Sequence, residues 1–276
     1  MKNAIKIFFV LLFLSSCDND YQDVKVFYET GEIKAEGVMY LGFEDGFWTR
    51  YYKNGNKESE GEFFKGVQTG DWYWYFDNGM MKESSHFEEN DAHGMSKRYF
   101  KNGQIRAQDI WAYDLREGRS YAFHENGLKS YAGLFNDGLR DSVWVWYYDN
   151  GVIEDSVRFV FGDEQGLGVS YFKNGNKKEY GQWKNGYKYG VWRYFSNEGK
   201  LNKKGEFNEF GYREGTWVLK DSLNKFDSII KYISGYIDTS YSIPADTFNL
   251  DSLNIQPFEL KGGENENEGS YLDMEG

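Results

Sequence analysis

Cys17 is the residue of this 276-residue chain whose place in the sequence most clearly suggests chemistry. It is the only cysteine, and it follows Leu14-Ser15-Ser16 at the end of an apolar run over residues 7–14. That run is too short to span a bilayer, and Lys2 and Lys6 precede it, as in a secretory signal. A lone cysteine at the end of such a run is a candidate for covalent modification.

The segment Leu14-Ser15-Ser16-Cys17 resembles the bacterial lipobox, at which a signal peptidase cuts before the lipidated cysteine. This resemblance implies that Cys17 is lipidated on its sulfur and becomes the mature N-terminus. We therefore expect residues 1–16 to be a signal peptide, 17–24 an anchor and linker, and the membrane to be one partner. The expected location is the cell envelope, at the outer membrane of a Gram-negative bacterium. The acidic residues 18–20 are compatible with exposure on the cell surface or with a solvated linker. With one cysteine there is no intramolecular disulfide and no cysteine-based metal site.

The histidines and paired acids show no catalytic pattern. His86 and His93 are close in sequence, but their gap fits no zinc motif, and His124 lies in a different repeat. Glu88-Glu89 and Asp163-Glu164 fall in predicted links between hairpins, where acids are usually solvated. We expect no enzyme activity, no cofactor and no metal, and surface or cross-strand roles for the histidines.

The charge of the chain argues against nucleic acid as a partner. The formal net charge is −12, and removal of residues 1–16 takes away two lysines and no acid. A protein that binds nucleic acid needs a basic face that releases counterions, whereas these lysines alternate with glutamates.

A period of 24 residues organises most of the sequence. Glycine recurs at this spacing at Gly31, Gly55, Gly79, Gly103, Gly127, Gly151, Gly175 and Gly199. Six of the eight follow asparagine, and Asn-Gly favours a two-residue hairpin turn with both central residues at positive φ. Each repeat is therefore predicted to be a β-hairpin. In the second unit we expect strands over 47–53 and 57–64, joined by Asn54-Gly55, and a link over 65–70.

The repeats predict an all-β fold: an elongated twisted ribbon of tandem antiparallel β-hairpins over 25–243, with no helical domain. The array comprises about eight units and a degenerate end unit. A lone hairpin is marginal in water, but stacked hairpins share a buried face, so stability accumulates along the array. Aromatic residues make up 20% of the chain and suit such a pleated, half-buried surface.

Tryptophan recurs at one repeat position in several units, and adjacent aromatic pairs recur in most of them. Because side chains alternate along a strand, one ring of each adjacent pair must lie on the face away from the other. An exposed row of rings would suit a sugar, a peptide or a lipid head group. The candidate binding aromatics are Trp48, Trp72, Trp74, Trp144, Trp146 and Trp192. The alternative is that lysine and glutamate side chains cover the rings, or that the sheet curls over them.

The phrase Gly-x-Trp-x-x-Tyr-Tyr-x-Asn-Gly-x-x-x-x-x-Gly-x-Phe over 46–63 resembles the MORN-repeat variant family of bacteria. The resemblance covers about 27–217 and implies a ribbon of successive hairpins. Most members have no assigned activity, and some carry an antitoxin label. Ser96, Ser120 and Gly168 stand where the pattern has tryptophan.

Two irregularities and the C-terminal region need separate expectations. At residues 196–199 the aromatic pair comes one residue early, which predicts a longer loop, and the 25-residue spacing between Gly190 and Gly215 implies an inserted residue. Residues 226–243 are expected to form the last one or two strands. Their packing candidates are Ile229, Tyr232, Ile233 and Tyr236. The tail over 244–276, with eight acids and one lysine, is predicted to be disordered.

Three function hypotheses follow. The favoured one is a lipid-anchored, non-enzymatic scaffold with a protein partner in the envelope. The alternative is a glycan-binding module that uses aromatic rows. The weaker alternative, an antitoxin, conflicts with an export signal.

Overall fold

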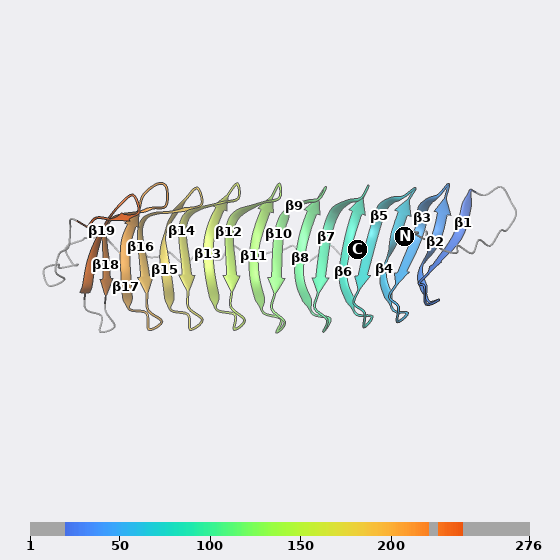
Figure 1. Ribbon diagram of the computed structural model, residues 1–276, viewed down its shortest axis with the longest axis horizontal. Coiled ribbons are helices and arrows are strands. Elements are labelled where there is room, and N and C mark those ends of the chain that lie inside the picture. The colour runs from blue at the N-terminus through green and yellow to red at the C-terminus, as the bar shows by residue number, and fades with distance from the viewer. Residues whose placement is uncertain (1–19, 221–225, 240–276) are drawn as a thin grey trace, which may run out of the picture.

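The computed structural model describes residues 20–220 and 226–239, and in these residues twenty strands form one antiparallel sheet (Figure 1). The strands are β1 (Tyr21–Phe27), β2 (Ile33–Tyr40), β3 (Phe43–Tyr51), β4 (Lys57–Phe64), β5 (Val67–Tyr75), β6 (Met81–Glu88), β7 (Asp91–Tyr99), β8 (Ile105–Ala112), β9 (Leu115–Arg116), β10 (Gly118–Phe123), β11 (Lys129–Asn136), β12 (Leu139–Tyr147), β13 (Ile153–Val160), β14 (Asp163–Tyr171), β15 (Lys177–Lys184), β16 (Tyr187–Phe195), β17 (Leu201–Phe207), β18 (Arg213–Lys220), β19 (Phe226–Ile233) and β20 (Tyr236–Ile237). The predicted all-β fold is confirmed.

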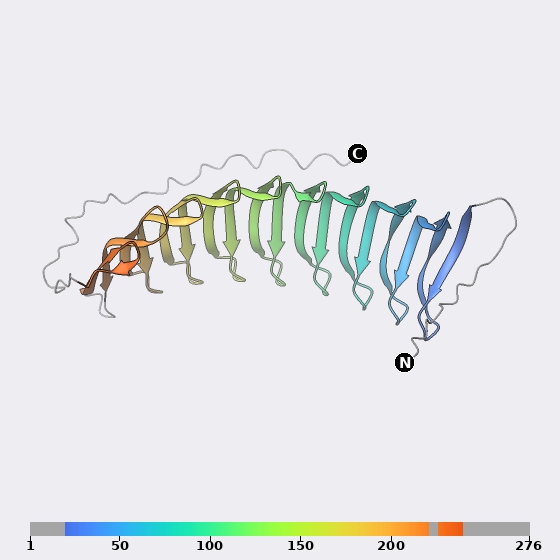
Figure 2. The same cartoon turned by 45° about the horizontal axis from the view of Figure 1, so that its top comes forward.

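The sheet is a meander in which each strand pairs with its neighbours in the sequence. The exception is β8, which pairs with both β9 and β10, because one strand of this unit is split at Glu117. The ribbon is long and curves into an arc (Figure 2). No helix in the described residues is long and apolar enough to cross a membrane.

The Asn-Gly turns differ from the predicted type. All eight turn glycines have positive φ, but none of the asparagines before them does. In the second unit Gly55 N donates to Tyr52 O and Tyr52 N donates to Asn56 O, so the loop has three residues and ends in a bulge at Gly55. Asn54 is preferred here because its Oδ1 accepts the Asn56 N–H at 3.0 Å.

The two-residue turn with two positive φ values occurs on the opposite edge of the ribbon. There it replaces the predicted link over 65–70: Lys65 and Gly66 have φ of 52° and 84°, and β5 begins directly after them at Val67. The same turn recurs at Leu41-Gly42, Glu89-Asn90, Tyr113-Asp114, Asp137-Gly138, Phe161-Gly162, Asn185-Gly186 and Ser234-Gly235. In the second unit β3 is therefore longer than the predicted strand over 47–53, whereas β4 has the predicted bounds of 57–64, and the array is a continuous sheet.

A bulge in every second strand places the tryptophan side chain over a glycine of the neighbouring strand in five units. Gly70 has φ of 67°, and the pairing of β4 with β5 shifts between Glu60 and Glu62. As a result the Trp72 indole lies on Gly61, where a built β-carbon would be 2.3 Å from Trp72 Cδ2. The pairs with this arrangement are Gly37 and Trp48, Gly61 and Trp72, Gly133 and Trp144, Gly181 and Trp192, and Gly205 and Trp217.

The ends of the array correct several boundaries. β1 begins at Tyr21, inside the predicted linker. The turn at 196–199 is not longer than the others, because Gly199 N donates to Ser196 O and Ser196 N to Lys200 O. The inserted residue lies in the turn before β18, where Gly211 N donates to Asn208 O.

The last strands confirm part of the C-terminal prediction. Ile229 and Tyr232 are buried, whereas Ile233 and Tyr236 are exposed and do not pack in the core. Cys17, the expected signal peptide over 1–16 and the expected tail over 244–276 lie outside the described residues.

Candidate functional site

Four of the six candidate binding tryptophans form the core of the ribbon. Trp48, Trp72, Trp144 and Trp192 are only 1–3% exposed. Each indole N–H donates to a backbone carbonyl ten residues earlier, at 2.9–3.1 Å. The expectation of an exposed row is therefore wrong at these positions, because the bulge and the facing glycine let each indole lie flat within the sheet. Trp74 and Trp146 are half-buried beside them.

In four units the second side chain of the aromatic pair connects one turn to the next by a hydrogen bond. Tyr28, Tyr52 and Tyr148 donate their hydroxyls to backbone carbonyls 23 residues later, at 2.7–2.8 Å. His124 Nε2 makes the equivalent contact with Tyr147 O at 2.8 Å. These side chains tie successive repeats together, which explains why a histidine can replace a tyrosine at this position.

The other two histidines face each other across β6 and β7. His86 pairs in register with His93, and its Nδ1 lies 2.8 Å from Asp71 Oδ1. Within residues 20–220 and 226–239, no group of three or more His, Cys, Asp or Glu side chains could hold a metal ion.

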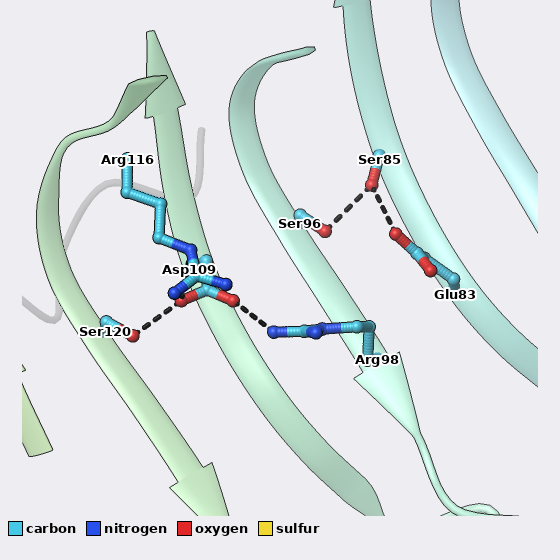
Figure 3. Close-up of polar contacts among 7 residues, drawn as sticks. All are labelled: Glu83, Ser85, Ser96, Arg98, Asp109, Arg116 and Ser120. Carbon is cyan, nitrogen blue, oxygen red and sulfur yellow. Dashed lines mark hydrogen bonds and ion pairs between the residues drawn. The ribbon is translucent and has the colours of Figure 1, made fainter. Parts of the chain in front are cut away.

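A buried polar centre interrupts the tryptophan core in the middle of the ribbon (Figure 3). We define it as Glu83, Ser85, Ser96, Arg98, Asp109, Arg116 and Ser120. Asp109 takes the place of the glycine that faces tryptophan in other units, and Ser120 takes the place of that tryptophan. Arg98 Nη2 lies 2.6 Å from Asp109 Oδ2, and Ser120 Oγ donates to Asp109 Oδ1 at 2.5 Å.

The carboxylate in the middle of the polar centre is buried. Asp109 and Ser120 are each 1% exposed, and the Arg116 guanidinium, 3.9 Å away, also faces the carboxylate. In the neighbouring unit Ser85 Oγ donates a hydrogen bond to Ser96 Oγ at 2.8 Å. The group is therefore a hydrogen-bonded substitute for the Trp–Gly pair.

Two hollows open on the tryptophan face where the tryptophan is missing and no polar group replaces it. The first, about 980 Å³, lies at the start of the array, where Val24 occupies the tryptophan position; Val26, Ala35, Met39 and Trp48 also line it. We call it the Val24 hollow. The second, about 430 Å³, lies at Gly168, and we call it the Gly168 hollow.

The Gly168 hollow combines rings and carboxylates. Its aromatic wall comprises Trp146, Phe159, Trp183 and Trp192, and the carboxylates of Glu154, Asp155, Glu164 and Glu179 surround it, with Arg140 and Lys178 as the bases. Burial raises the pKa of the Asp155 carboxyl, and a hydrogen bond from Ser170 opposes this shift. Lys188 holds Glu179 at 2.9 Å.

Glu164 was expected in a solvated link, but it is the second residue of β14 and faces this hollow. The loss of tryptophan at Gly168 was visible in the sequence. Its consequence was not, because the sequence did not show that the tryptophan fills the face.

Exposed apolar side chains line the edge that carries the two-residue turns. They lie in or directly beside these turns, and we call them the turn-edge row: Leu41, Phe43, Phe64, Tyr113, Leu115, Leu139, Phe161, Tyr187, Phe210, Tyr212 and Tyr236. Neighbouring members contact the next turn, since a β-carbon built on Gly66 would be 3.2 Å from Phe43 and one on Gly162 would be 3.4 Å from Leu139.

Comparison with known proteins identifies the repeat in part of the array. The family model described as the MORN repeat variant matches residues 44–65, 68–89 and 92–111, which contain the hairpins β3–β4, β5–β6 and most of β7–β8. No curated protein matches the chain.

Among solved structures, the chain is similar to one titled "Crystal Structure of TcdB2-TccC3-Cdc42", with 11% identity and a TM-score of 0.21 over 74% of this chain and 12% of that one. A second, "Crystal Structure of TcdB2-TccC3 without hypervariable C-terminal region", has 11% identity and a TM-score of 0.15 over 80% and 16% of the two chains. The chain thus spans less than a fifth of the length of either structure.

Proposed function

We propose that this protein is a lipid-anchored, non-enzymatic scaffold of the bacterial cell envelope that binds a protein partner along its ribbon. The observation that supports this most is the turn-edge row. Large apolar side chains gain free energy when a partner removes them from water, and an apolar surface repeated along one edge is typical of protein interaction sites. Three matched MORN repeat variants support a repeat scaffold.

The arrangement of the polar groups supports binding rather than catalysis. The buried carboxylate of Asp109 is satisfied by Arg98 and Ser120, His86 makes a cross-strand contact with Asp71, and His124 makes a backbone contact with Tyr147 O. A rigid ribbon that repeats similar contacts every 24 residues offers an extended surface, as other repeat proteins do.

The protein partner is tested by photo-crosslinking in cells. A photoreactive residue at Phe161, which is 81% exposed, should capture one partner reproducibly, and a probe at Asn126 on the opposite edge should not. The triple variant Phe64→Ser, Phe161→Ser and Tyr187→Ser should lose that partner and retain its circular dichroism spectrum. Equal capture from both edges, or unchanged capture by the triple variant, would contradict the proposal.

The anchor is tested separately. Replacing Cys17 by alanine should abolish acyl labelling and release the protein from the membrane fraction. Protease accessibility on intact cells then distinguishes an outward-facing protein from a periplasmic one. Unchanged labelling and fractionation would remove the anchor from the proposal.

A glycan-binding module is the second candidate, because the Gly168 hollow has an aromatic wall suited to sugar rings. A panel of envelope polysaccharides distinguishes the two. Enrichment of a polysaccharide that Trp146→Ala and Trp183→Ala abolish would favour the glycan, whereas loss of binding in the triple turn-edge variant favours the protein partner.

A further inference from the structure

We infer that the Gly168 hollow receives a basic side chain, an arginine or a lysine, from the bound protein partner. This inference rests on the proposed function and specifies the chemistry that the partner must present. It comes from a comparison of equivalent positions along the array.

In four units, a basic residue at one repeat position covers the rings of the tryptophan face. Arg140 Cζ lies 4.9 Å from the Trp144 ring centroid and 5.4 Å from that of Phe159. The equivalents of Arg140 are Arg116, 5.1 Å from Phe135, Lys188, 3.9 Å from Trp192, and Arg213, 4.8 Å from Trp217. Cations are attracted to the negative faces of aromatic rings at such distances. These units therefore supply their own cation.

The unit between Arg140 and Lys188 has an acid at this position. Glu164 lies 24 residues after Arg140 and 24 before Lys188. The rings that Arg140 covers, Trp144, Trp146 and Phe159, correspond to Gly168, Ser170 and Trp183 in the Glu164 unit. The Glu164 unit therefore lacks the two rings equivalent to Trp144 and Trp146 and the cation equivalent to Arg140. The hollow lies where these three side chains would be.

One ring remains, and its nearest cation is distant: Lys188 Nζ lies 5.9 Å from the Trp183 ring centroid but 3.9 Å from that of Trp192. The Trp183 indole has turned over Gly168, where a built β-carbon would lie 2.3 Å from Trp183 Nε1. Within the described part of the chain, this N–H has no acceptor, whereas the five buried tryptophans all donate to a carbonyl. Trp183 therefore offers a ring face and a free N–H beside Glu164.

The charges of the hollow favour a cation. Lys188 neutralises Glu179, and Arg140 covers the rings of the preceding unit. Among the described residues, the carboxylates of Glu154, Asp155 and Glu164 have no ion-pair partner, and neither do the two bases that line the hollow, Arg140 and Lys178. The unpaired acids therefore outnumber the unpaired bases. The pKa of the Asp155 carboxyl is raised, mainly by burial, and no neighbouring cation lowers it to its ordinary value. A guanidinium or ammonium group from the partner would form an ion pair with these carboxylates.

The position of the hollow points to a side chain of the protein partner. Phe161, in the turn directly before β14, and Tyr187, the first residue of β16, belong to the turn-edge row. Glu164 is next to this edge, since a β-carbon on Gly186 would be 3.6 Å from Glu164 Oε2. A partner on the row can therefore extend a basic side chain into the hollow.

The test uses peptides and the folded full chain. A capped Gly/Ser peptide with one central arginine is titrated into the protein, and the Trp183 indole N–H resonance is followed by NMR. The arginine peptide should shift this resonance in a saturable way, and a lysine peptide should do so more weakly. The matched citrulline peptide, which is neutral and of similar shape, should bind at least tenfold more weakly.

Two variants assign the effect to the hollow. Glu164→Arg places the protein's own cation at the position that Arg140 occupies one unit earlier, so it should weaken the peptide at least tenfold. Asp163→Arg makes the same charge change at the neighbouring exposed residue and should alter affinity less than twofold. The triple variant Val157→Gly, Gly168→Trp and Trp183→Phe reproduces the Gly133, Trp144 and Phe159 arrangement and should close the hollow. Because this variant lacks the Trp183 indole, its peptide binding is measured by isothermal titration calorimetry and should be at least tenfold weaker than that of the parent.

Equal binding of arginine and citrulline peptides, or equal effects of Glu164→Arg and Asp163→Arg, would overturn the inference. A Trp183 shift with an oligosaccharide but not with the arginine peptide would assign the hollow to a glycan and also overturn it. The scaffold proposal is judged separately by the turn-edge variant in cells, so either idea can fail alone.

Discussion

The units around Trp144 and Ser120 fill the same pair of facing positions, one with apolar groups and the other with hydrogen-bonded polar groups. In the first, the indole lies on Gly133 and packs against Phe135 and Phe159. In the second, Ser120 and Asp109 occupy the equivalent positions and are joined by hydrogen bonds and by Arg98 (Figure 3). A third unit, at Gly168, has neither and leaves a hollow.

The comparison shows that the backbone of the repeat does not depend on tryptophan. Strand pairing and turn geometry continue through all three units, apart from the split between β9 and β10. The two facing positions, 11 residues apart, act as one packing unit: Gly with Trp, Ser with Ser, Asp with Ser, and Val with Gly. The face of the ribbon can therefore be filled, made polar or opened without a change of fold.

The largest predicted effect is in the apolar version of the unit. Trp144→Ala removes a side chain that is 2% exposed and an indole N–H bond to Leu134 O, so it should cost about 3–5 kcal/mol of unfolding free energy. Urea denaturation followed by circular dichroism measures this. The half-buried Trp146→Ala is the control, and an equal cost for the two would contradict a core role specific to Trp144.

The polar version should be sensitive to the loss of one partner. Asp109→Ala leaves the Ser120 hydroxyl unpaired in the core and removes the carboxylate that binds Arg98, so we expect a loss of about 3 kcal/mol, at the low end for buried pairs because Arg98 reaches solvent.

A sharper test replaces the polar pair of this unit by the Gly–Trp pair of the other units. Asp109→Gly with Ser120→Trp recreates the Gly133 and Trp144 pair, with Arg116 placed to cover the ring as Arg140 does. Replacing a buried ion pair by packed apolar groups is often neutral or stabilising, so this double variant should be at least as stable as the parent. A double variant less stable than Asp109→Ala would show that the two units are not interchangeable.

A smaller effect is expected at the glycine of the pair. Gly61→Ala forces a β-carbon into the Trp72 indole and should cost about 2 kcal/mol. In a Trp72→Ser background, which resembles Ser85 and Ser96, the same change should cost almost nothing. The double-mutant cycle measures this coupling, and additive effects would contradict it.

These units also show how far the sequence could be read. The spacing of Gly31 to Gly199 predicted the hairpins and their order, because local strand pairing follows from short turns. The turn type was assigned to the wrong edge, because Asn54-Gly55 fits a two-residue turn equally well on composition. The structure distinguishes the longer loop by its backbone hydrogen bonds between Tyr52, Gly55 and Asn56 and by the Asn54 Oδ1 bond to the Asn56 N–H.

The candidate site was less accessible to sequence reasoning. Ser96, Ser120 and Gly168 were recognised as departures from the pattern, but their effect depends on which residue faces each of them across the strand. Alignment of positions 85 with 96, 109 with 120 and 157 with 168 would have shown the compensation. The role of Glu164 requires in addition the knowledge that Arg140 and Lys188 lie over rings.

The smallest predicted effect concerns Glu36, a carboxylate outside the core. It provides a partly exposed counterpart to the buried carboxylate of Asp109. Tyr51 Oη donates to Glu36 Oε1 at 2.7 Å, and this bond, followed by burial, raises the pKa of Tyr51 from 10.0 to about 12. The pKa of Glu36 is lowered by its hydrogen bonds from Lys25 and Tyr51. Glu36→Gln should bring the Tyr51 pKa back toward 10.0, as measured by NMR titration of labelled tyrosines.

The pH dependence of this contact follows from the direction of the Tyr51 shift. Because the folded-state pKa of the phenol is raised, its contribution to stability is fully present below the ordinary value of 10.0 and is lost as the pH rises through about 12. Tyr52, whose pKa is raised mainly by burial, should be unaffected by Glu36→Gln and is the control. Since Glu36 and Tyr51 are partly solvated, the substitution should leave stability at neutral pH nearly unchanged. A loss as large as that of Asp109→Ala would mean that the carboxylates outside the core contribute as much as the polar centre, and that burial is not what distinguishes them.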